Sequence, residues 1–363
     1  METKANHAKS CSDQELAHDL SCMNLGSKSR QTATATLLYV DVLNYATNFF
    51  PLSDWNVTRS FARVKRFVDA SARAGIGLKV FLDDTVISAE AMSKWQHRRE
   101  DEVRKGKKNV PHGMNSMLGE MFGKCGVDVL YSSEADNDDT IAAYAHEHGA
   151  GILSGDKDMF RYIGATFAVY SEYSISSTGR LSLTPHPKGT PGAFSHPNPL
   201  PLPSTLPRTR PSMQHVKDGA YLRGAPSPCV RAVGRNPHAL VAALRHAAYA
   251  RAGLACPIRE QWPEWDPAAA RVVWHDAAAA VPPADPALLA LLGRPDAAAA
   301  AFFPDECGRP GGGGAPPGGV PASERRKHRF CVRSCVYEAC AMAGGPSLLE
   351  LWLRHEAAAR PAR

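Results

Sequence analysis

Short apolar runs alternate with helix-like segments between residues 35 and 153. Residues 35–41, 78–82, 127–131 and 151–153 are apolar along most of their length, as in parallel strands that are covered on both faces. Between the first two runs, apolar side chains recur at helical spacing at Phe61, Val64, Phe67 and Val68. The order strand, helix, strand predicts right-handed parallel crossovers and therefore an α/β fold with helices flanking a parallel sheet.

Local signals predict where these elements begin and end. Ser53 or Asp54 is expected to cap the helix that carries Phe61, and Gly75 and Gly77 are expected to end it. A β-hairpin is expected over residues 167–170 and 181–184, around a turn at residues 177–180. The α/β unit is therefore predicted to run from residue 37 to residue 184, after a flexible leader over residues 1–36.

The pattern changes after residue 184. Residues 185–212 are dense in proline and predict an extended linker or a disordered insertion. Residues 213–363 predict a mainly α-helical region, whose first helix is capped by Asn236 and Pro237. Its candidate helices are residues 236–253, 286–292, 323–342 and 346–359. No structure is predicted for the glycine-rich stretch 309–319 or for the alanine runs.

Composition narrows the class of protein. The net charge of +6 in 363 residues is mild and points weakly to polyanionic partners. The nine cysteines form no CxxC pair, so neither a zinc ribbon nor a disulfide framework is indicated. Cys331, Cys335 and Cys340 are predicted to be small apolar residues on a helix face. Reduced thiols and the lack of a long apolar run favour an intracellular protein, in the nucleus or cytoplasm, with no membrane partner.

Acidic side chains from four segments are expected to meet at one edge of the sheet, because ligands of open parallel sheets lie outside the carboxyl ends of the strands. They are Asp41, Asp84, the group Glu134, Asp136, Asp138 and Asp139, and the pair Asp156 and Asp158. So many carboxylates repel one another, and a hard divalent cation would relieve that repulsion. The alternative is a solvated acidic helix cap followed by an Asp-rich turn.

A cluster of this kind suits two divalent ions about 4 Å apart, which activate water and stabilise the leaving oxygen of a phosphodiester. The basic segment 90–108 follows the second strand and contains Lys94, Arg98 and Arg99, which are predicted to hold nucleic-acid phosphates. The alternative for this segment is a solvated helix face. No GxSxG, P-loop or GxGxxG motif is present. His146 and His148 do not share a helix face and are expected to be exposed or capping residues.

Residues 37 to about 184 resemble a PIN-like nuclease domain of the XPG/flap endonuclease type. The resemblance lies in LLYVDVLNYATNFF, in VFLDD followed by the basic segment, and in SEADNDDTIAAYA and ILSGDKDMF. It implies Mg²⁺ or Mn²⁺ as cofactor, with DNA or RNA as substrate. The implied ligands are Asp41, Asp84, the pair Asp136 and Asp138, with Glu134 and Asp139 as rivals, and the pair Asp156 and Asp158. Arg98 and Lys94 resemble the basic residues that contact the scissile phosphate.

The chain also departs from flap endonucleases. Their further acid and their helix–two-turn–helix are not visible, and the proline-rich segment stands in that place. YLRGAPSPCVRA and RNPHALVAALRHAAYARAGL resemble the carboxy-terminal helical part of Asteroid-type proteins. Two hypotheses follow. One is a metal-dependent nuclease. The other is an Asteroid-like scaffold that binds nucleic acid, or protein partners through the linker or the helical region. A third, an NYN-type ribonuclease hinted at by Asp41, Asn44 and Tyr45, is disfavoured by the basic segment.

Overall fold

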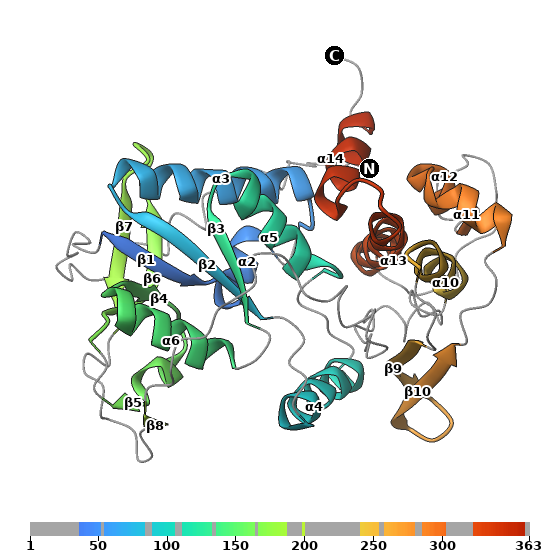
Figure 1. Cartoon of the computed structure of the whole chain (residues 1–363), viewed down its shortest axis with the longest axis horizontal. Helices are drawn as coiled ribbons and strands as arrows, with labels where there is room; N and C mark the ends of the chain where they lie inside the picture. Colours follow the sequence, from blue (N-terminus) through green and yellow to red (C-terminus); the bar gives the residue numbers. More distant parts are fainter. Residues whose placement is uncertain are drawn as a thin grey trace, which may run out of the picture.

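The computed structural model describes residues 36–51, 54–83, 89–105, 111–132, 136–163, 166–186, 198–199, 240–253, 258–279, 285–302 and 322–359. They form an α/β part around one six-stranded sheet and a second part of helices with one β-hairpin (Figure 1). The predicted leader, most of the predicted linker and the glycine-rich stretch lie outside these residues, so the predicted domain boundaries stay predictions. No helix in the described ranges is both long and apolar enough to cross a bilayer.

The six-stranded sheet has the order β3-β2-β1-β4-β6-β7. Neighbouring strands are parallel except for β7, which runs antiparallel to β6. This confirms the predicted parallel sheet and its terminal hairpin, and the order is consistent with a PIN-like fold. The strands are β1 (Leu37–Asp41), β2 (Gly77–Asp83), β3 (Asp128–Ser132), β4 (Gly151–Leu153), β6 (Val169–Ile175) and β7 (Leu181–Pro185).

Both faces of β1 are covered, which explains why its sequence is a continuous apolar run. Leu38 and Val40 belong to the core under α3 (Val57–Arg73) and α5 (Met114–Lys124). Tyr39 points to the opposite face, into a second core with Ile141 of α6 (Asn137–His148). Figure 1 shows α3 and α5 on one side of the sheet and α6 on the other.

The first helix begins later than predicted. Asn56 is its N-cap, and the Asn56 side chain accepts a hydrogen bond from the Arg59 backbone N–H at 2.8 Å. The prediction of a cap at Ser53 or Asp54 is therefore wrong, because Asn56 satisfies the donor that a cap must satisfy. The predicted end of the helix at Gly75 is confirmed, because Gly75 follows the C-cap Ala74 and has a φ of 71°. Gly77 instead opens β2.

The second part confirms the prediction of a mainly helical region. Its helices are α10 (Ala242–Arg251), α11 (Pro286–Leu292), α12 (Pro295–Phe302), α13 (Ala322–Met342) and α14 (Leu348–Ala358). The predicted cap at Asn236 and Pro237 lies outside the described residues. Helix α12 contains an alanine run for which no structure was predicted. Alanine has the highest intrinsic helix propensity, which explains the difference.

An antiparallel hairpin of β9 (Ile258–Asp266) and β10 (Arg271–Ala279) was missed from the sequence. Its turn is Pro-Ala-Ala-Ala and lacks the Asn-Gly type of signal that marks hairpins, and Ala270 adopts a positive φ of 49° there. Pro263 within β9 also argues against a strand in sequence terms. The mainly helical region therefore contains a β-hairpin that the sequence did not predict.

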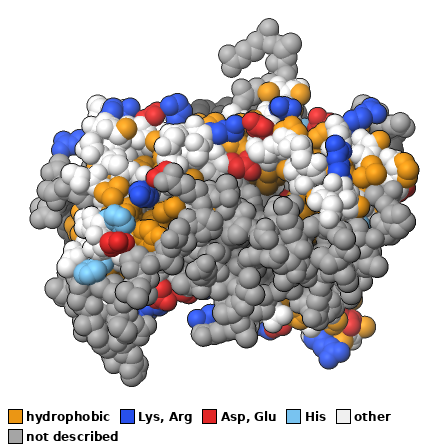
Figure 2. Space-filling model, in the orientation of Figure 1, with side chains coloured by type: hydrophobic (Ala, Val, Ile, Leu, Met, Phe, Trp, Pro, Cys, Tyr) orange, Lys and Arg blue, Asp and Glu red, His pale blue; other side chains and the backbone are white. Residues whose placement is uncertain are grey.

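The two parts share one hydrophobic core. Leu349 and Trp352 of α14 belong to the same cluster as Phe67 of α3 and Phe122 of α5. Cys331, Cys335 and Cys340 are buried on α13, as predicted for small apolar residues on a helix face. On the face drawn in Figure 2, acidic and basic side chains are interspersed along the edge formed by α3 and α14.

Backbone N–H groups at two helix starts bind carboxylates from the other part of the chain. Glu356 of α14 accepts hydrogen bonds from the backbone N–H groups of Val57 and Thr58, both at 2.8 Å. Glu120 of α5 accepts one from Leu349 at 2.8 Å. Each carboxylate satisfies donors that have no partner within the helix and also complements the helix dipole.

Replacing Glu356 with alanine is expected to lower the free energy of unfolding by about 1–2 kcal/mol, because two N–H donors of α3 lose their acceptor. Urea unfolding followed by circular dichroism measures the change. Arg354→Ala is the matched control, since Arg354 is exposed on the same helix. Equal losses in both variants would show that Glu356 has no capping role.

Candidate functional site

The candidate site lies where the strand order of the sheet reverses. The chain runs from β1 to β2 to β3 on one side, and β4 then pairs with β1 on the other side. In open parallel sheets such a switch point leaves a crevice outside the carboxyl ends of the strands. Asp41 is the last residue of β1, and Asp156 and Asp158 directly follow β4.

Asp41 forms the buried floor of this site. Its side chain is buried, with the residue 3 % exposed, and its carboxylate accepts hydrogen bonds from Asn44, from Ser154 Oγ at 3.2 Å and from Asn137 Nδ2 at 3.4 Å. Burial raises the pKa of Asp41, and the hydrogen bonds from Asn44 and Ser154 oppose that rise. The carboxylate is therefore held in one orientation at the end of β1.

The groups around Asp41 form a connected polar network. Ser132, at the end of β3, donates to Asn137 Oδ1 at 2.7 Å. Ser154 accepts from Asn44 Nδ2 at 3.2 Å and from the Asp156 backbone N–H at 3.1 Å. The network ties together the ends of β1, β3 and β4, so it sets the position of the acids that follow them.

Sequence reasoning did not assign a role to Ser132, Asn137 or Ser154, and it noted Asn44 only within the NYN hint. One signal was available. Ser132 and Ser154 are polar residues at the ends of buried apolar runs, and both are fully buried. Buried polar side chains need partners, so such positions predict hydrogen bonding at the sheet edge.

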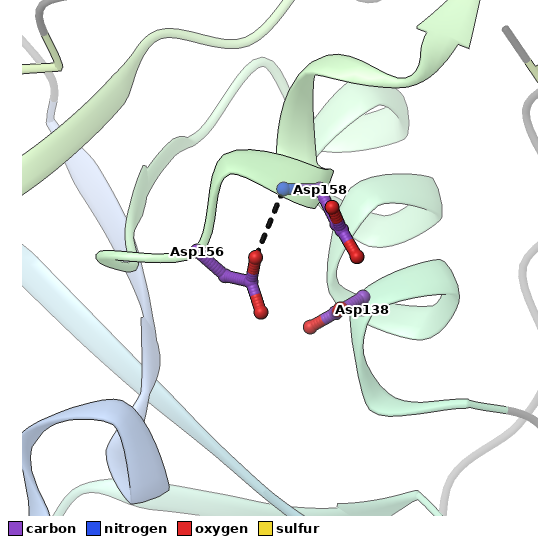
Figure 3. A group of neighbouring side chains, drawn as sticks. All are labelled: Asp138, Asp156 and Asp158. Carbon is purple, nitrogen blue, oxygen red and sulfur yellow. Dashed lines mark hydrogen bonds between the residues drawn. The ribbon is translucent and has the colours of Figure 1, made fainter. Parts of the chain in front are cut away.

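Three carboxylates converge close to Asp41, whose charge interacts with those of Asp138 and Asp156. Asp138, Asp156 and Asp158 each offer one oxygen atom, and these atoms lie within 4.8 Å of one another. Figure 3 shows Asp138, on the first turn of α6, facing Asp156 and Asp158. Asp156 caps the short helix η2 (Lys157–Phe160) by accepting from the Asp158 backbone N–H at 3.0 Å. The cap holds both acids of the pair beside α6.

The electrostatics of the cluster favour a cation. Burial, followed by the charges of Asp41, Asp136 and Asp156, raises the pKa of Asp138 to about 8, while Arg161 opposes the rise. Three carboxylate oxygens without nitrogen or sulfur ligands form a donor set that fits hard divalent cations such as Mg²⁺ or Mn²⁺. The residues present therefore fit a metal ion of this class.

Asp136 and Asp139, the other described acids at the start of α6, each accept a hydrogen bond outside the three-carboxylate cluster or from its backbone. Asp139 accepts from Arg161 Nη2 at 2.6 Å and from the Tyr162 hydroxyl. The exposed Asp136 is the N-cap of α6 and accepts from the Asp138 backbone N–H at 3.0 Å. Glu134 and Asp84 lie outside the described residues. Ligand roles for these four acids stay predictions.

Comparisons with known proteins found only distant similarities to solved structures. No protein-family model matches the sequence, and no curated protein sequence does. Among solved structures, the chain is similar to the catalytic core of Rad2 in complex with a DNA substrate. The identity is 18 %, the TM-score is 0.29, and 41 % of this chain and 48 % of that chain are covered.

Two further structures are similar at the same level. Human GEN1 in complex with Holliday junction DNA is 14 % identical with a TM-score of 0.28, covering 47 % of this chain and 43 % of that one. A flap endonuclease of bacteriophage T5, in complex with DNA and metal ions, is 11 % identical with a TM-score of 0.26, covering 88 % and 97 %. The chain thus spans less than half the length of the Rad2 and GEN1 chains. TM-scores of this size do not establish a shared fold, so the fold assignment rests on the strand order.

The predicted basic segment forms helix α4 (Ala89–Lys105). Five residues separate it from the end of β2, so it begins at most about 20 Å from the sheet edge that carries the acids. Lys94 and Arg98 are exposed, whereas the Arg99 side chain is 19 % exposed and pairs with Glu102 at 3.0 Å. The segment therefore has an exposed face that carries cationic groups, and phosphate binding by Lys94, Arg98 and Arg99 stays a prediction.

The histidines of α6 are placed as predicted. His146 and His148 are exposed, and His148 Nδ1 lies 2.8 Å from the carbonyl oxygen of Tyr144, near the end of the helix. His146 Nδ1 lies 3.0 Å from Thr166 Oγ1. Neither belongs to the carboxylate cluster.

Proposed function

We propose that this protein is a divalent-metal-dependent nuclease that hydrolyses phosphodiester bonds of DNA or RNA, with a PIN-like domain of the XPG/flap endonuclease type. One observation carries the proposal. Asp138, Asp156 and Asp158 converge close to the buried Asp41 at the switch point of a parallel sheet. A solvated acidic surface would not require a buried carboxylate held by three polar side chains beneath it.

The residues of the cluster have distinct roles in this proposal. Asp138, Asp156 and Asp158 hold a Mg²⁺ or Mn²⁺ ion, and Asp41 adds negative charge from below. Asp84, Asp136, Glu134 and Asp139 are the candidates for the ligands of a second ion. When bound, the ions supply a Lewis acid that activates water and stabilises charge on the leaving oxygen. Asn44, Asn137 and Ser154 keep Asp41 oriented.

The substrate-binding residues are proposed on α4. Lys94 and Arg98 lie one helical turn apart and are exposed, so they present two cations on the same face of the helix. Cations of this kind provide most of the affinity for a phosphate backbone. Arg99 is proposed to support the helix through Glu102 and to contact phosphate only at its exposed edge.

Cleavage by the purified full chain tests the proposal. Labelled flap DNA, single-stranded DNA and single-stranded RNA are incubated with the protein in MnCl₂ or MgCl₂, and with EDTA as a control. At least one substrate is expected to be cut, and EDTA and the Asp156→Asn/Asp158→Asn variant are each expected to abolish cleavage. Equal cleavage by the wild type and by the Asp156→Asn/Asp158→Asn variant would indicate a contaminating nuclease and contradict the proposal. Binding without cleavage would instead favour the Asteroid-like scaffold.

A further inference from the structure

The β9–β10 hairpin packs against the basic helix α4, although the two segments belong to different parts of the chain. Among the described elements, β9 and β10 are the main packing partners of α4. Figure 1 shows α4 set apart from the sheet, with the hairpin beside it. The orientation of α4 therefore depends on the hairpin more than on the sheet.

One hydrogen bond defines this contact. Trp274 Nε1 on β10 donates to Glu100 Oε1 on α4 at 2.7 Å, across 174 residues of sequence. A hydrogen bond to a charged acceptor is stronger than one between neutral groups. Val103 is the one apolar residue among the described side chains of α4, and it is buried. Among these described side chains, polar contacts such as the one from Trp274 to Glu100 therefore join Val103 in setting the orientation of the helix.

The two faces of α4 are distinct. At 100° per residue, Arg99 and Val103 lie on the side of the helix opposite Lys94 and Arg98. Arg99 and Val103 are the less exposed members, and Lys94 and Arg98 are exposed. The contact with the hairpin thus leaves the cationic pair directed outward.

The hairpin is itself anchored to the helical part. Arg245 of α10 donates to both carboxylate oxygens of Glu260 on β9, at 2.9 and 2.6 Å, and Tyr249 donates to the same carboxylate at 2.7 Å. Arg245 and Glu260 are 0 % and 1 % exposed. Helix α10 packs on α13, α13 on α14, and α14 on α3 and α5 of the α/β part. A series of packed elements therefore connects α4 back to the domain that carries the acids.

We propose that the β9–β10 hairpin is a positioning element for α4, which sets the direction of Lys94 and Arg98 before nucleic acid binds. Trp274 and Glu100 are its positioning residues. The consequence for substrate binding rests on the proposed nuclease function, whereas the ordering of α4 does not. Preorganised cationic side chains bind phosphates with less loss of conformational entropy on binding.

Hydrogen exchange of α4 tests the ordering without any reference to activity. In the full chain without metal or nucleic acid, Trp274→Phe and Glu100→Ala are each expected to speed exchange of the amides of residues 94–105 about three- to tenfold. Glu100→Gln keeps an acceptor oxygen but loses the charge, and it is expected to speed exchange less than Glu100→Ala does. Arg271→Ala, an exposed change on the same hairpin, is the matched control. Unchanged exchange in both Trp274→Phe and Glu100→Ala would overturn the proposal.

Steady-state kinetics then separates positioning from a general loss of structure. Trp274→Phe is expected to raise KM for the cleaved nucleic acid about three- to tenfold, with kcat and Mn²⁺ affinity unchanged. A fall in kcat at constant KM would contradict positioning through α4. If α4 exchanges faster in the variants while the wild-type protein cuts no substrate, the positioning element is supported and the nuclease function is not.

Discussion

Replacing Asp138 with asparagine is expected to reduce metal-dependent cleavage about a thousandfold, because one of three converging ligands loses its charge. The same change is expected to stabilise the metal-free protein by about 1–3 kcal/mol. The Asp138 carboxyl is partly buried beside Asp41 and Asp156, and its pKa of about 8 shows that the charged form is disfavoured there. Loss of activity together with a gain in stability is the expected signature of a site for a cation.

The pH dependence follows from the direction of this shift. The pKa of Asp138 is raised from 3.8 to about 8 in the folded protein, so the folded state binds more protons than the unfolded state between these values. Below about pH 4 Asp138 is protonated in both states and does not lower the stability of the folded protein. As pH rises from 4 toward 8, the free energy of unfolding falls, because only the unfolded state can ionise Asp138 at little cost. Urea unfolding at pH 5 and pH 8 in EDTA is expected to show this loss in the wild type and a smaller one in Asp138→Asn.

A matched control for this prediction is Asp69→Asn. The Asp69 side chain on α3 is 42 % exposed and pairs with Lys65 at 3.1 Å, so its neutralisation is expected to change stability by less than about 0.5 kcal/mol and to leave cleavage intact. A metal-free Asp138→Asn variant that is less stable than the wild type would contradict the prediction, because it would show that repulsion among the carboxylates does not destabilise the folded protein.

Replacing Glu260 with leucine is expected to destabilise the protein by about 3–5 kcal/mol. The change leaves the Arg245 guanidinium fully buried without its counterion, and Tyr249 loses its acceptor. Urea unfolding measures the loss. The control on the same strand is Glu264→Gln, because Glu264 pairs with the exposed His275 at 3.0 Å and is expected to contribute little.

The double variant Arg245→Leu/Glu260→Leu distinguishes an unpaired buried charge from lost packing. Removing both charges is expected to recover most of the stability lost in the single variant, since well-packed apolar residues often replace a buried ion pair at little cost. A double variant that is less stable than Glu260→Leu would show that the pair is a net source of stability.

The strands of the α/β part could be predicted because their signal is local. The runs ending at Asp41 and Leu153 are apolar on both faces, which is typical of parallel strands covered on both sides. The acids that follow them could then be placed at one edge by topology alone. The mostly parallel sheet and the helical second part were both confirmed on this basis.

The finer arrangement of the site depends on contacts that no local pattern reveals. Asp138 and Asp139 are adjacent in sequence, yet one faces Asp156 while the other pairs with Arg161, twenty-two residues away. Asn137 reaches Asp41 from across the sheet edge. Helix phase and tertiary partners decide these directions. The β9–β10 hairpin was not predicted for a related reason. Its strands contain Pro263 and are joined by an alanine-rich turn, and contacts with α4 and α10 stabilise them.

Titration of the metal-free protein with Mn²⁺ in a calorimeter tests most directly whether Asp138, Asp156 and Asp158 form a metal site. The wild type and Asp69→Asn are expected to give the same saturable isotherm, with a dissociation constant in the millimolar range or tighter. Asp156→Asn/Asp158→Asn is expected to show no saturable heat while remaining folded. Saturable binding of equal strength in that double variant, or its absence in the wild type, would contradict a metal site at this cluster.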